Sequence, residues 1–346
     1  MGADTSAAAK GKPRYRAVIV GCGKIGALFE SEAKRAKPAS HAGAVIQNPK
    51  TVLAALVDTN PKNLAAAGQM FPHAARYSSL SACLKNERPD IVVISTPPAG
   101  RARLVRACVQ SGVKMIVCEK PLAANVREGR LIGKVLAGSR TAFVLNYQRR
   151  FSPLFKRVRE DIKRGAIGRL EQITCYYSNG LFNNGGHIID ALRYIVAERI
   201  VSVQATQNTK NTTHPKGDSN VDALLTTAGG ITVALQSFDQ RAYAIHDIHI
   251  MGTKGAITLT DFGQHGIWRF AGPSKFAGIR ALSAARTREH KEPLSATRDA
   301  LLQAIRCFEG NVRPESGVES GIAVLCVLEA LKKSANAGGK KVRVQY

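Results

Sequence analysis

Three glycines near the N-terminus have a spacing that suits a bound dinucleotide. Gly21, Gly23 and Gly26 follow the apolar run 17–20 in a G-x-G-x-x-G pattern. The first glycine permits a tight turn, the second lets a pyrophosphate approach, and the third lets a helix pack on the strand. A helix beginning near Lys24 would direct its positive dipole end at the phosphates. The alternative is a tight turn without a ligand. The predicted cofactor residues here are Gly21, Gly23, Lys24, Ile25 and Gly26.

Lys120 is the first candidate for proton transfer. It follows the apolar run 115–118, which reads as a strand, and ligands bind at the carboxyl ends of strands in open α/β sheets. Desolvation lowers the pKa of a partly buried lysine, which can then exchange a proton near neutral pH. Glu119 and Pro121 would position it. A surface ion pair is the alternative.

A predicted helix over 186–197 carries a second set of candidates. His187, Asp190 and Tyr194 are spaced by three and four residues, so all three side chains can share one face. The imidazole has a pKa near neutrality, whereas the tyrosine would need a nearby cation to act as a base. The predicted catalytic residues are therefore Lys120, His187, Asp190 and Tyr194. A capping histidine with a packed tyrosine is the alternative.

Other strand ends add binding residues. Asp58 ends the apolar run 52–57, where an acid can accept hydrogen bonds from the adenosine ribose and repel a 2′-phosphate. This favours NAD, with NADP as the alternative; Asp58 is also a typical turn residue. The remaining cofactor candidates are Ser95, Thr96, Pro97, Pro98, Glu119 and Lys120. The substrate-binding candidates are Lys120, Asn146, Arg149, Arg150 and His187. For Arg149 and Arg150, ion pairs between domains are the alternative.

The elements that must position these residues change character along the chain. Apolar runs alternate with helical segments up to about residue 146, which predicts a doubly wound parallel sheet. The helix after the glycines is expected to continue through a polar extension, 30–40, ending near Pro38. Later strand-like runs lack intervening helices and predict a mostly antiparallel sheet. Residues 271–295 are read as irregular, with closing helices at 296–308 and 318–335.

Composition restricts the class of protein. The chain has 346 residues, of which 45% are hydrophobic, so we expect about two folded domains. No apolar run is long enough to span a membrane and no signal peptide is recognisable, so a cytoplasmic protein is expected. Seven scattered cysteines form no C-x-x-C pair, and His246 and His249 lack a third ligand, so no metal site is predicted. The net charge of +25 favours an anionic partner, such as a phosphorylated substrate or a nucleotide sugar; a basic surface that serves solubility is the alternative.

Taken together, the motifs resemble the Gfo/Idh/MocA family of NAD(P)-dependent oxidoreductases over about 16–345. The matching stretches are 21–26, Ser95-Thr96-Pro97-Pro98, Cys118-Glu119-Lys120-Pro121-Leu122, 146–151, Gly185-Gly186 with Asp190, and 252–255. The resemblance implies an α/β plus α+β fold: a tail over 1–13, a Rossmann domain over 14–146, and a domain over 147–346 with a large, mostly antiparallel open sheet. It also implies that the last helix packs back on the first domain and that the sheet forms a homodimer or homotetramer.

The resemblance implies oxidation or reduction of a sugar, sugar derivative or nucleotide sugar, with the family's lysine at Lys120. The stretch 180–187 looks like members associated with surface-polysaccharide synthesis. Many family dehydrogenases have an aspartate followed four residues later by a histidine; here Asp190 is followed by Tyr194, and His187 is the alternative acid/base. A nonenzymatic NAD-binding regulator is the other function considered. Basic clusters lack interleaved aromatic residues, so no specific nucleic-acid binding is expected.

Overall fold

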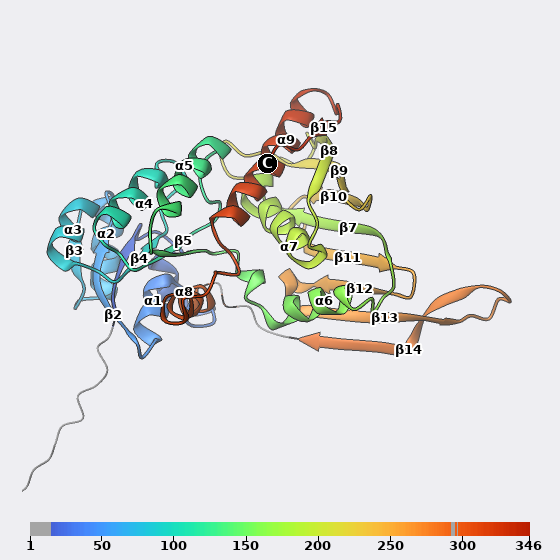
Figure 1. The fold of residues 1–346 in the computed structure, drawn as a ribbon, viewed down its shortest axis with the longest axis horizontal. Coiled ribbons are helices and arrows are strands. Elements are labelled where there is room, and N and C mark those ends of the chain that lie inside the picture. The colour runs from blue at the N-terminus through green and yellow to red at the C-terminus, as the bar shows by residue number, and fades with distance from the viewer. Residues whose placement is uncertain (1–14, 292–294, 296) are drawn as a thin grey trace, which may run out of the picture.

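The protein consists of two sheets that share a continuous set of apolar contacts, as seen in a computed structural model that describes residues 15–291, 295 and 297–346 (Figure 1). Buried side chains such as Ile116 in the first sheet, Ile173 in the second and Leu328 in a late helix belong to one apolar cluster. The two domains are therefore packed against each other. The tail predicted for 1–13 lies outside the described residues.

The first domain is built on a six-stranded parallel sheet with strand order β3-β2-β1-β4-β5-β6. Its central strands are almost wholly buried, as the apolar runs predict. The strands are β1 (Tyr15–Val20), β2 (Thr51–Val57), β3 (Ala75–Tyr77), β4 (Ile91–Ile94), β5 (Met115–Cys118) and β6 (Ala142–Leu145). The helices are α1 (His41–Gln47), α2 (Pro61–Met70), α3 (Leu80–Glu87), α4 (Arg101–Gln110) and α5 (Val126–Ala137).

The second domain is built on a nine-stranded sheet with order β14-β13-β12-β11-β7-β10-β9-β8-β15, in which only β7 and β10 pair in parallel. In the chain, helix α6 (Pro153–Lys163) comes before the first strand of this sheet, and helix α7 (Gly186–Val196) comes between its first two strands. The strands are β7 (Leu170–Ser178), β8 (Ile200–Gln207), β9 (Val221–Thr227), β10 (Thr232–Phe238), β11 (His246–Gly252), β12 (Gly255–Thr260), β13 (His265–Pro273), β14 (Arg280–Lys291) and β15 (Val342–Arg343). The Rossmann domain and the mostly antiparallel sheet are as predicted.

The two closing helices join the domains. Helix α8 (Arg298–Gly310) packs on β5 and β6 of the first sheet and on α1, although it follows the second sheet in the chain. Helix α9 (Val318–Asn336) lies between α5 of the first domain and β8 of the second. The chain thus crosses between the domains several times, which fixes the cleft between them. No helix of the described residues is long and apolar enough to cross a membrane.

Two segments differ from the sequence-based expectation. The helix after the glycines does not run through 30–40: a short 3-10 helix, η1 (Leu28–Ser31), and a loop separate the turn from α1. The region 271–295 is not irregular throughout, because β13 and β14 pair and project from the body of the molecule (Figure 1). The sequence of β14 is basic and lacks a run of strand-forming residues, so its pairing with β13 overrides its weak propensity.

Candidate active site

The glycine turn has the shape that a dinucleotide needs. Gly21 has a φ of +94°, and a Cβ added to it would lie 2.8 Å from the carbonyl carbon of Ser95. A Cβ on Gly26 would lie 1.9 Å from the carbonyl oxygen of Gly21. At Gly23, by contrast, no atom of the described chain lies within 4 Å of such a Cβ. The turn is therefore closed toward the protein and open at its middle glycine, where a pyrophosphate would approach.

Asp58 and Ser95 hold this turn from two neighbouring strands. The Oδ2 atom of Asp58 accepts a hydrogen bond from the Cys22 N–H at 2.7 Å, and its Oδ1 accepts from the Asn60 N–H at 2.8 Å. The Ser95 hydroxyl donates to the Gly21 carbonyl at 2.7 Å. Asp58 therefore has a structural role in addition to the ribose contact predicted for it.

A cavity of about 670 Å³ lies at the carboxyl ends of the first sheet's strands and reaches the second domain. Nine predicted site residues line it: Ile25, Ser95, Thr96, Pro97, Pro98, Glu119, Lys120, Asn146 and His187. Seven residues that were not among the predicted site residues complete the wall: Phe29, Arg35, Arg101, Pro121, Gln148, Asn183 and Asn184. The cavity thus joins the cofactor turn to the candidate acid/base residues.

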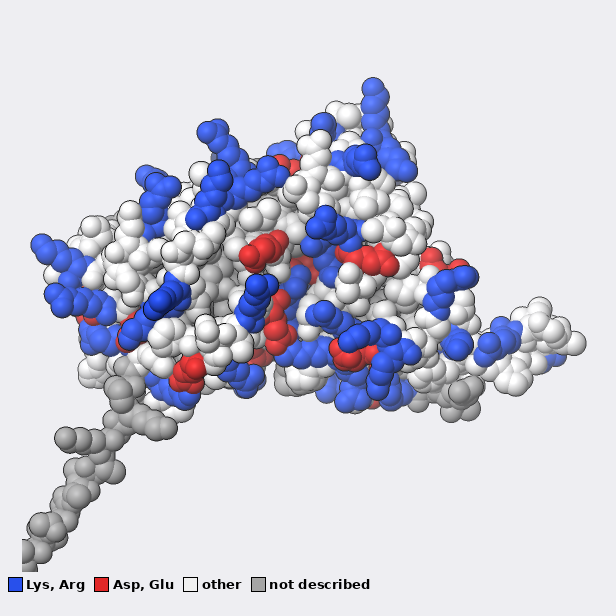
Figure 2. Space-filling model, viewed as in Figure 1, with Lys and Arg blue, Asp and Glu red and all other residues white. Residues whose placement is uncertain are grey.

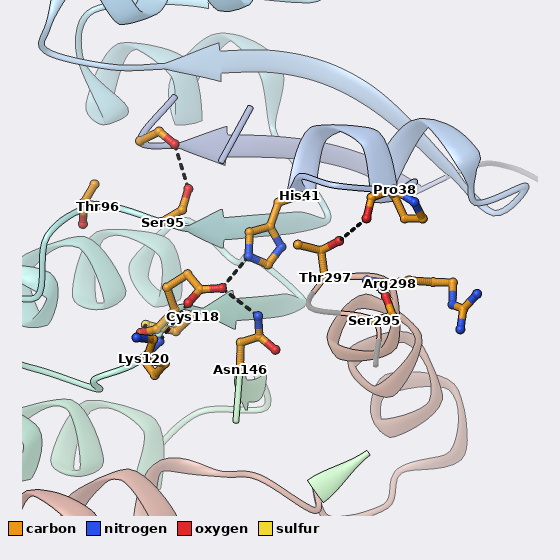
Figure 3. A network of polar contacts seen from close by, with 12 residues as sticks. Pro38, His41, Ser95, Thr96, Cys118, Lys120, Asn146, Ser295, Thr297 and Arg298 are labelled. Atoms are coloured by element: carbon orange, nitrogen blue, oxygen red, sulfur yellow. Dashed lines mark hydrogen bonds and ion pairs between the residues drawn. The ribbon is translucent and has the colours of Figure 1, made fainter. Parts of the chain in front are cut away.

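Glu119 is fixed on the cavity wall by two buried partners (Figure 3). Its Oε1 accepts from Nδ2 of Asn146 at 2.6 Å and lies 2.8 Å from Nε2 of His41, the first residue of α1. Burial raises the pKa of Glu119, but the hydrogen bonds from His41 and Asn146 outweigh it, so the pKa is lowered. Glu119 is therefore held as a carboxylate beside Lys120. His41 has no motif of its own, so only the tertiary structure reveals it.

Arg101, the first residue of α4, fixes the backbone on both sides of the same motif. Its guanidinium donates to the Thr96 carbonyl at 2.5 Å and to the carbonyls of Glu119 and Pro121. The side chain is 2% exposed. Arg101 therefore ties the loop after β4 to the loop after β5, and so fixes where Lys120 emerges.

Lys120 meets the second domain at Asn183. Its Nζ donates to the backbone carbonyl and to Oδ1 of Asn183, both at 3.1 Å. Asn183 lies in a π-helical turn, η3 (Leu181–Gly185), whose backbone N–H groups are held by the carboxylate of Asp218. Burial lowers the pKa of Lys120, while the charge of Glu119 opposes the shift. The lysine therefore bonds a neutral amide, which leaves it able to exchange a proton.

His187 follows this turn on the same helical segment, four residues after Asn183, and that spacing is the signal that could have indicated Asn183. Burial lowers the pKa of His187 well below its usual value, and the charges of Lys120 and Arg149 add to the shift. Its Nδ1 has no hydrogen-bond partner among the described residues. Burial and the neighbouring cations therefore favour the neutral imidazole, whose Nδ1 is available for a hydrogen bond with a ligand.

Arg149 and His246 form a buried layer behind His187. The rings of His187 and His246 have centroids 6.4 Å apart, and Arg149 donates to the Phe262 carbonyl at 2.9 Å. Burial lowers the pKa of Arg149 to about 9. Neither Arg149 nor His246 is part of the cavity wall. The structure therefore places Arg149 beneath the predicted substrate site rather than in it.

Three other predicted residues lie together away from the cavity. Nε of Arg150 donates to both carboxylate oxygens of Asp190 at 2.9 Å, and Asp190 is 1% exposed. The ring of Tyr194 lies beneath the guanidinium groups of Arg150 and Arg159, at 5.2 and 4.7 Å from its centroid. Sharing a helix face with His187 therefore does not bring Asp190 or Tyr194 to Lys120, because Arg150 holds that part of the face.

No group of three or more His, Cys, Asp or Glu side chains that could hold a metal ion occurs in the part of the chain that the structure describes. His246 and His249, considered above for such a role, alternate on β11 and point to different neighbours. His246 lies against His187 and Phe262, and His249 against Tyr176.

A Rossmann domain, a cavity at its strand ends and a lysine beside a neutral histidine define an oxidoreductase of the two-domain dehydrogenase class. Residues 15–147 match the family described as "Oxidoreductase family, NAD-binding Rossmann fold", and residues 155–258 match the GFO/IDH/MocA C-terminal domain. The chain belongs to the Gfo/Idh/MocA family.

Relatives with established names agree with this assignment. The chain is 28% identical to inositol 2-dehydrogenase of Rhizobium meliloti over 69% of its own length and 73% of that protein. It is 25% identical to levoglucosan dehydrogenase of Pseudarthrobacter phenanthrenivorans over 51% and 50% of the two chains. The crystal structure of the WlbA dehydrogenase from Bordetella pertussis, in complex with NADH and UDP-GlcNAcA, has the same fold: the TM-score is 0.76 at 21% identity, covering 96% of this chain and 99% of that one.

NAD is the cofactor that this domain binds, and the described residues fit it. The open approach at Gly23, the carboxylate of Asp58 beside the turn and the buried Thr96 hydroxyl, which has no partner among the described residues, all suit a dinucleotide. When bound, the nicotinamide accepts or supplies a hydride.

Proposed function

We propose that this protein transfers a hydride between NAD(H) and a hydroxyl-bearing carbon of a sugar, sugar derivative or nucleotide sugar. The observation that carries the proposal is the cavity in which Lys120 and His187, from different domains, share a wall with the cofactor residues. Relatives named for inositol and levoglucosan act on polyhydroxylated rings, which supports the substrate class. A role in surface-polysaccharide synthesis is part of the proposal.

In the oxidative direction, the substrate hydroxyl gives up its proton while its carbon loses the hydride. Lys120 is the proposed proton acceptor, because its lowered pKa and neutral partner Asn183 leave it able to lose its own proton first. His187, neutral for the reasons given above, is the proposed second acid/base. Glu119 and Asn146 position Lys120, and the domain interface excludes water. In the reverse direction the same groups return the proton.

The substrate is proposed to be anionic. Arg35, Arg101 and Lys120 lie on the cavity wall, and Glu119 is the one acidic residue among its lining residues in the described part of the chain. Lys and Arg side chains are also spread over the face shown in Figure 2, with fewer Asp and Glu side chains among them. Because opposite charges attract over several ångströms in a narrow site, this balance favours a carboxylate or phosphate on the sugar.

A homodimer or homotetramer is proposed to form through the nine-stranded sheet. Helix α9 packs on β8 and β9 of the sheet, whereas Leu224 on β9 is 53% exposed beside Ala223 and Ala234. Analytical ultracentrifugation of wild type and Leu224→Arg tests this, since the variant is expected to lower the oligomeric state.

The activity is tested with purified protein and a panel of neutral and anionic substrates, following NADH absorbance in both directions. The panel contains myo-inositol, levoglucosan, UDP-N-acetylglucosamine and its uronate. Turnover with at least one sugar, abolished by Lys120→Met, is the expected result. NADH binding without turnover of any carbohydrate, over a broad pH range, would contradict the proposal and favour the nonenzymatic regulator.

A further inference from the structure

The inserted segment, residues 27–40, separates the glycine turn from α1 in the chain, but backbone hydrogen bonds join the turn and the helix directly. The His41 N–H donates to the Ile25 carbonyl at 2.9 Å, and the Ala42 N–H donates to the Gly26 carbonyl at 3.0 Å. The first turn of α1 therefore takes its hydrogen bonds from the glycine turn, as if the residues between them were absent. The segment is looped out at the point where the cofactor turn meets the cavity.

Internal hydrogen bonds hold the inserted segment in one shape. The Glu30 carboxylate accepts from the Ala39 N–H at 3.0 Å, and from the Ser40 N–H at 2.9 Å and hydroxyl at 2.8 Å. Lys37 Nζ donates to carbonyls on the opposite side of the loop, including that of Glu32 at 3.2 Å. Because side chains bind backbone groups at both ends, the loop is preorganised and loses little entropy when a ligand binds it.

The segment is also connected to the rest of the first domain. The Thr297 hydroxyl, just before α8, donates to the Pro38 carbonyl at 3.5 Å (Figure 3). Helix α8 in turn packs on α1. The loop is therefore held both by its internal hydrogen bonds and by a contact with the residues that precede α8.

Two side chains of the inserted segment reach the cavity that contains Lys120 and His187. The guanidinium carbon of Arg35 lies 3.7 Å from the centroid of the Phe29 ring, and both residues line the cavity. Stacking fixes the plane of the guanidinium and leaves its edges for hydrogen bonds. One edge is used, since Nε donates to Glu32 Oε2 at 2.6 Å. Its two Nη groups have no hydrogen bond within the described residues.

The other two cations on this wall are already committed. Arg101 donates to three backbone carbonyls, and Lys120 bonds both oxygens of Asn183. Arg35 is therefore the cation on the wall whose donors remain available to a ligand. A flat guanidinium with a free edge matches a carboxylate or a phosphate, which can accept two parallel hydrogen bonds.

We propose that the inserted segment is the specificity element of this enzyme, and that Arg35, stacked on Phe29, binds an anionic oxygen group of the substrate. The inference rests on the proposed sugar oxidoreductase function and deepens it. The anion is either a carboxylate on the sugar ring or a phosphate attached to it, because both present the same pair of oxygens.

Four probes distinguish the two sources of the anion: N-acetylglucosamine with neither group, glucuronate with the carboxylate, UDP-N-acetylglucosamine with the diphosphate, and its uronate with both. Binding is measured by calorimetry on the NADH-loaded protein, and KM and kcat are measured where turnover occurs. Arg35→Gln is compared with Lys34→Gln, which removes a neighbouring positive charge from the same loop without touching the cavity wall.

Arg35→Gln is expected to weaken binding of the anionic probe about tenfold or more, with little change for N-acetylglucosamine, for NADH or for kcat. Lys34→Gln is expected to change none of these, and Arg35→Lys to restore part of the affinity. Equal weakening of charged and neutral probes, a selective loss of NADH binding, or a wild type that binds no anionic probe more tightly than its neutral counterpart would overturn the inference. Absence of turnover with intact, Arg35-dependent binding would instead contradict the proposed function alone.

Discussion

Two groups of polar residues lie at helix α7, and they differ in how much of their hydrogen-bonding capacity other residues already use. The cavity group consists of Lys120, Asn183 and His187; the interior group consists of Arg150, Asp190 and Tyr194. In the interior group a carboxylate and a guanidinium neutralise each other with 2.9 Å hydrogen bonds, and cations cover the aromatic ring.

In the cavity group the Lys120 Nζ donates its hydrogen bonds to the neutral Asn183, with the Glu119 carboxylate nearby, and the Nδ1 atom of the imidazole has no partner in the described residues. Satisfied polar groups stabilise a fold, whereas a buried polar group without a partner is available for a ligand or a proton. We therefore propose a stabilising role for the interior group and a chemical role for the cavity group, although His187 and Asp190 lie on adjacent turns of the same helix.

The strongest test of this division is Lys120→Met. The variant is expected to fold and to bind NADH normally but to lose turnover by about a thousandfold, because the proton acceptor is missing. The loss should fall on kcat rather than on KM. Steady-state kinetics with whichever substrate of the panel the wild type turns over measures it, with NADH titration as the control for folding. Near-normal kcat would remove Lys120 from the mechanism.

Asp190→Asn addresses the interior group. The substitution leaves the buried Arg150 without its counter-charge, so we expect a loss of about 3 kcal/mol in the free energy of unfolding. The folded enzyme should keep most of its turnover. Urea denaturation and kinetics at low temperature separate the two effects. A variant of unchanged stability that is inactive would show that Asp190 is catalytic, as its position on the helix first suggested.

His187→Ala and Tyr194→Phe compare the two groups directly. Removing a general acid/base costs on the order of a hundredfold in rate, so His187→Ala should lower kcat at pH 7 by at least about that factor. Tyr194→Phe should cost clearly less, because its hydroxyl lies beside Arg159 rather than the cavity and burial raises its pKa. If Tyr194→Phe proves the more damaging variant, the assignment is reversed.

The pH dependence gives a second measurement on the same pair. Because the pKa of His187 is lowered in the folded protein, its imidazole stays neutral as the pH falls through 6.5. Protonation of Lys120 should cause one acidic decline in turnover, which remains in His187→Ala. Any further decline that depends on His187, and is therefore absent from His187→Ala, should lie below pH 6.5. A His187-dependent decline centred at or above pH 6.5 would contradict the lowered pKa.

The sequence predicted a residue's role where neighbouring residues in the chain determine it, and failed where a distant residue does. The glycine turn, the strand before it and the loop carrying Lys120 were predictable, because apolar runs and glycine spacing encode them directly. Asn183 and His41 were not, since each acquires its role from a contact with a residue more than sixty positions away. Helix-face geometry predicted that His187 and Asp190 lie together, but not that Arg150 would occupy the space beside Asp190.

The inserted segment and strand β14 differ from the prediction for the same reason. The inserted segment reads as a polar continuation of a helix, yet the glycine-turn carbonyls bond to α1 beyond it. Strand β14 exists because β13 pairs with it. In both cases the partner, and not the segment's own propensity, decides the backbone conformation.

Asp58 combines features of the cavity group and the interior group, and we expect the smallest mutational effect at this residue. Its carboxylate already accepts from the Cys22 and Asn60 N–H groups, but it also faces the open turn where the adenosine ribose would bind. Asp58→Ser removes the negative charge that would repel a 2′-phosphate, while a hydroxyl can still accept one of the backbone hydrogen bonds. The ratio of NAD to NADP dissociation constants should therefore shift toward NADP by about tenfold, a difference of about 1.4 kcal/mol.

Fluorescence titration with NADH and NADPH measures this ratio, and Asn63→Ala, which removes a long 3.4 Å contact to the same carboxylate, is the matched control. Wild-type protein that binds NADPH at least as tightly as NADH would contradict the role of Asp58 in cofactor selection. The Asp58 carboxylate would then have a structural role only, in holding the glycine turn through its hydrogen bonds to backbone N–H groups.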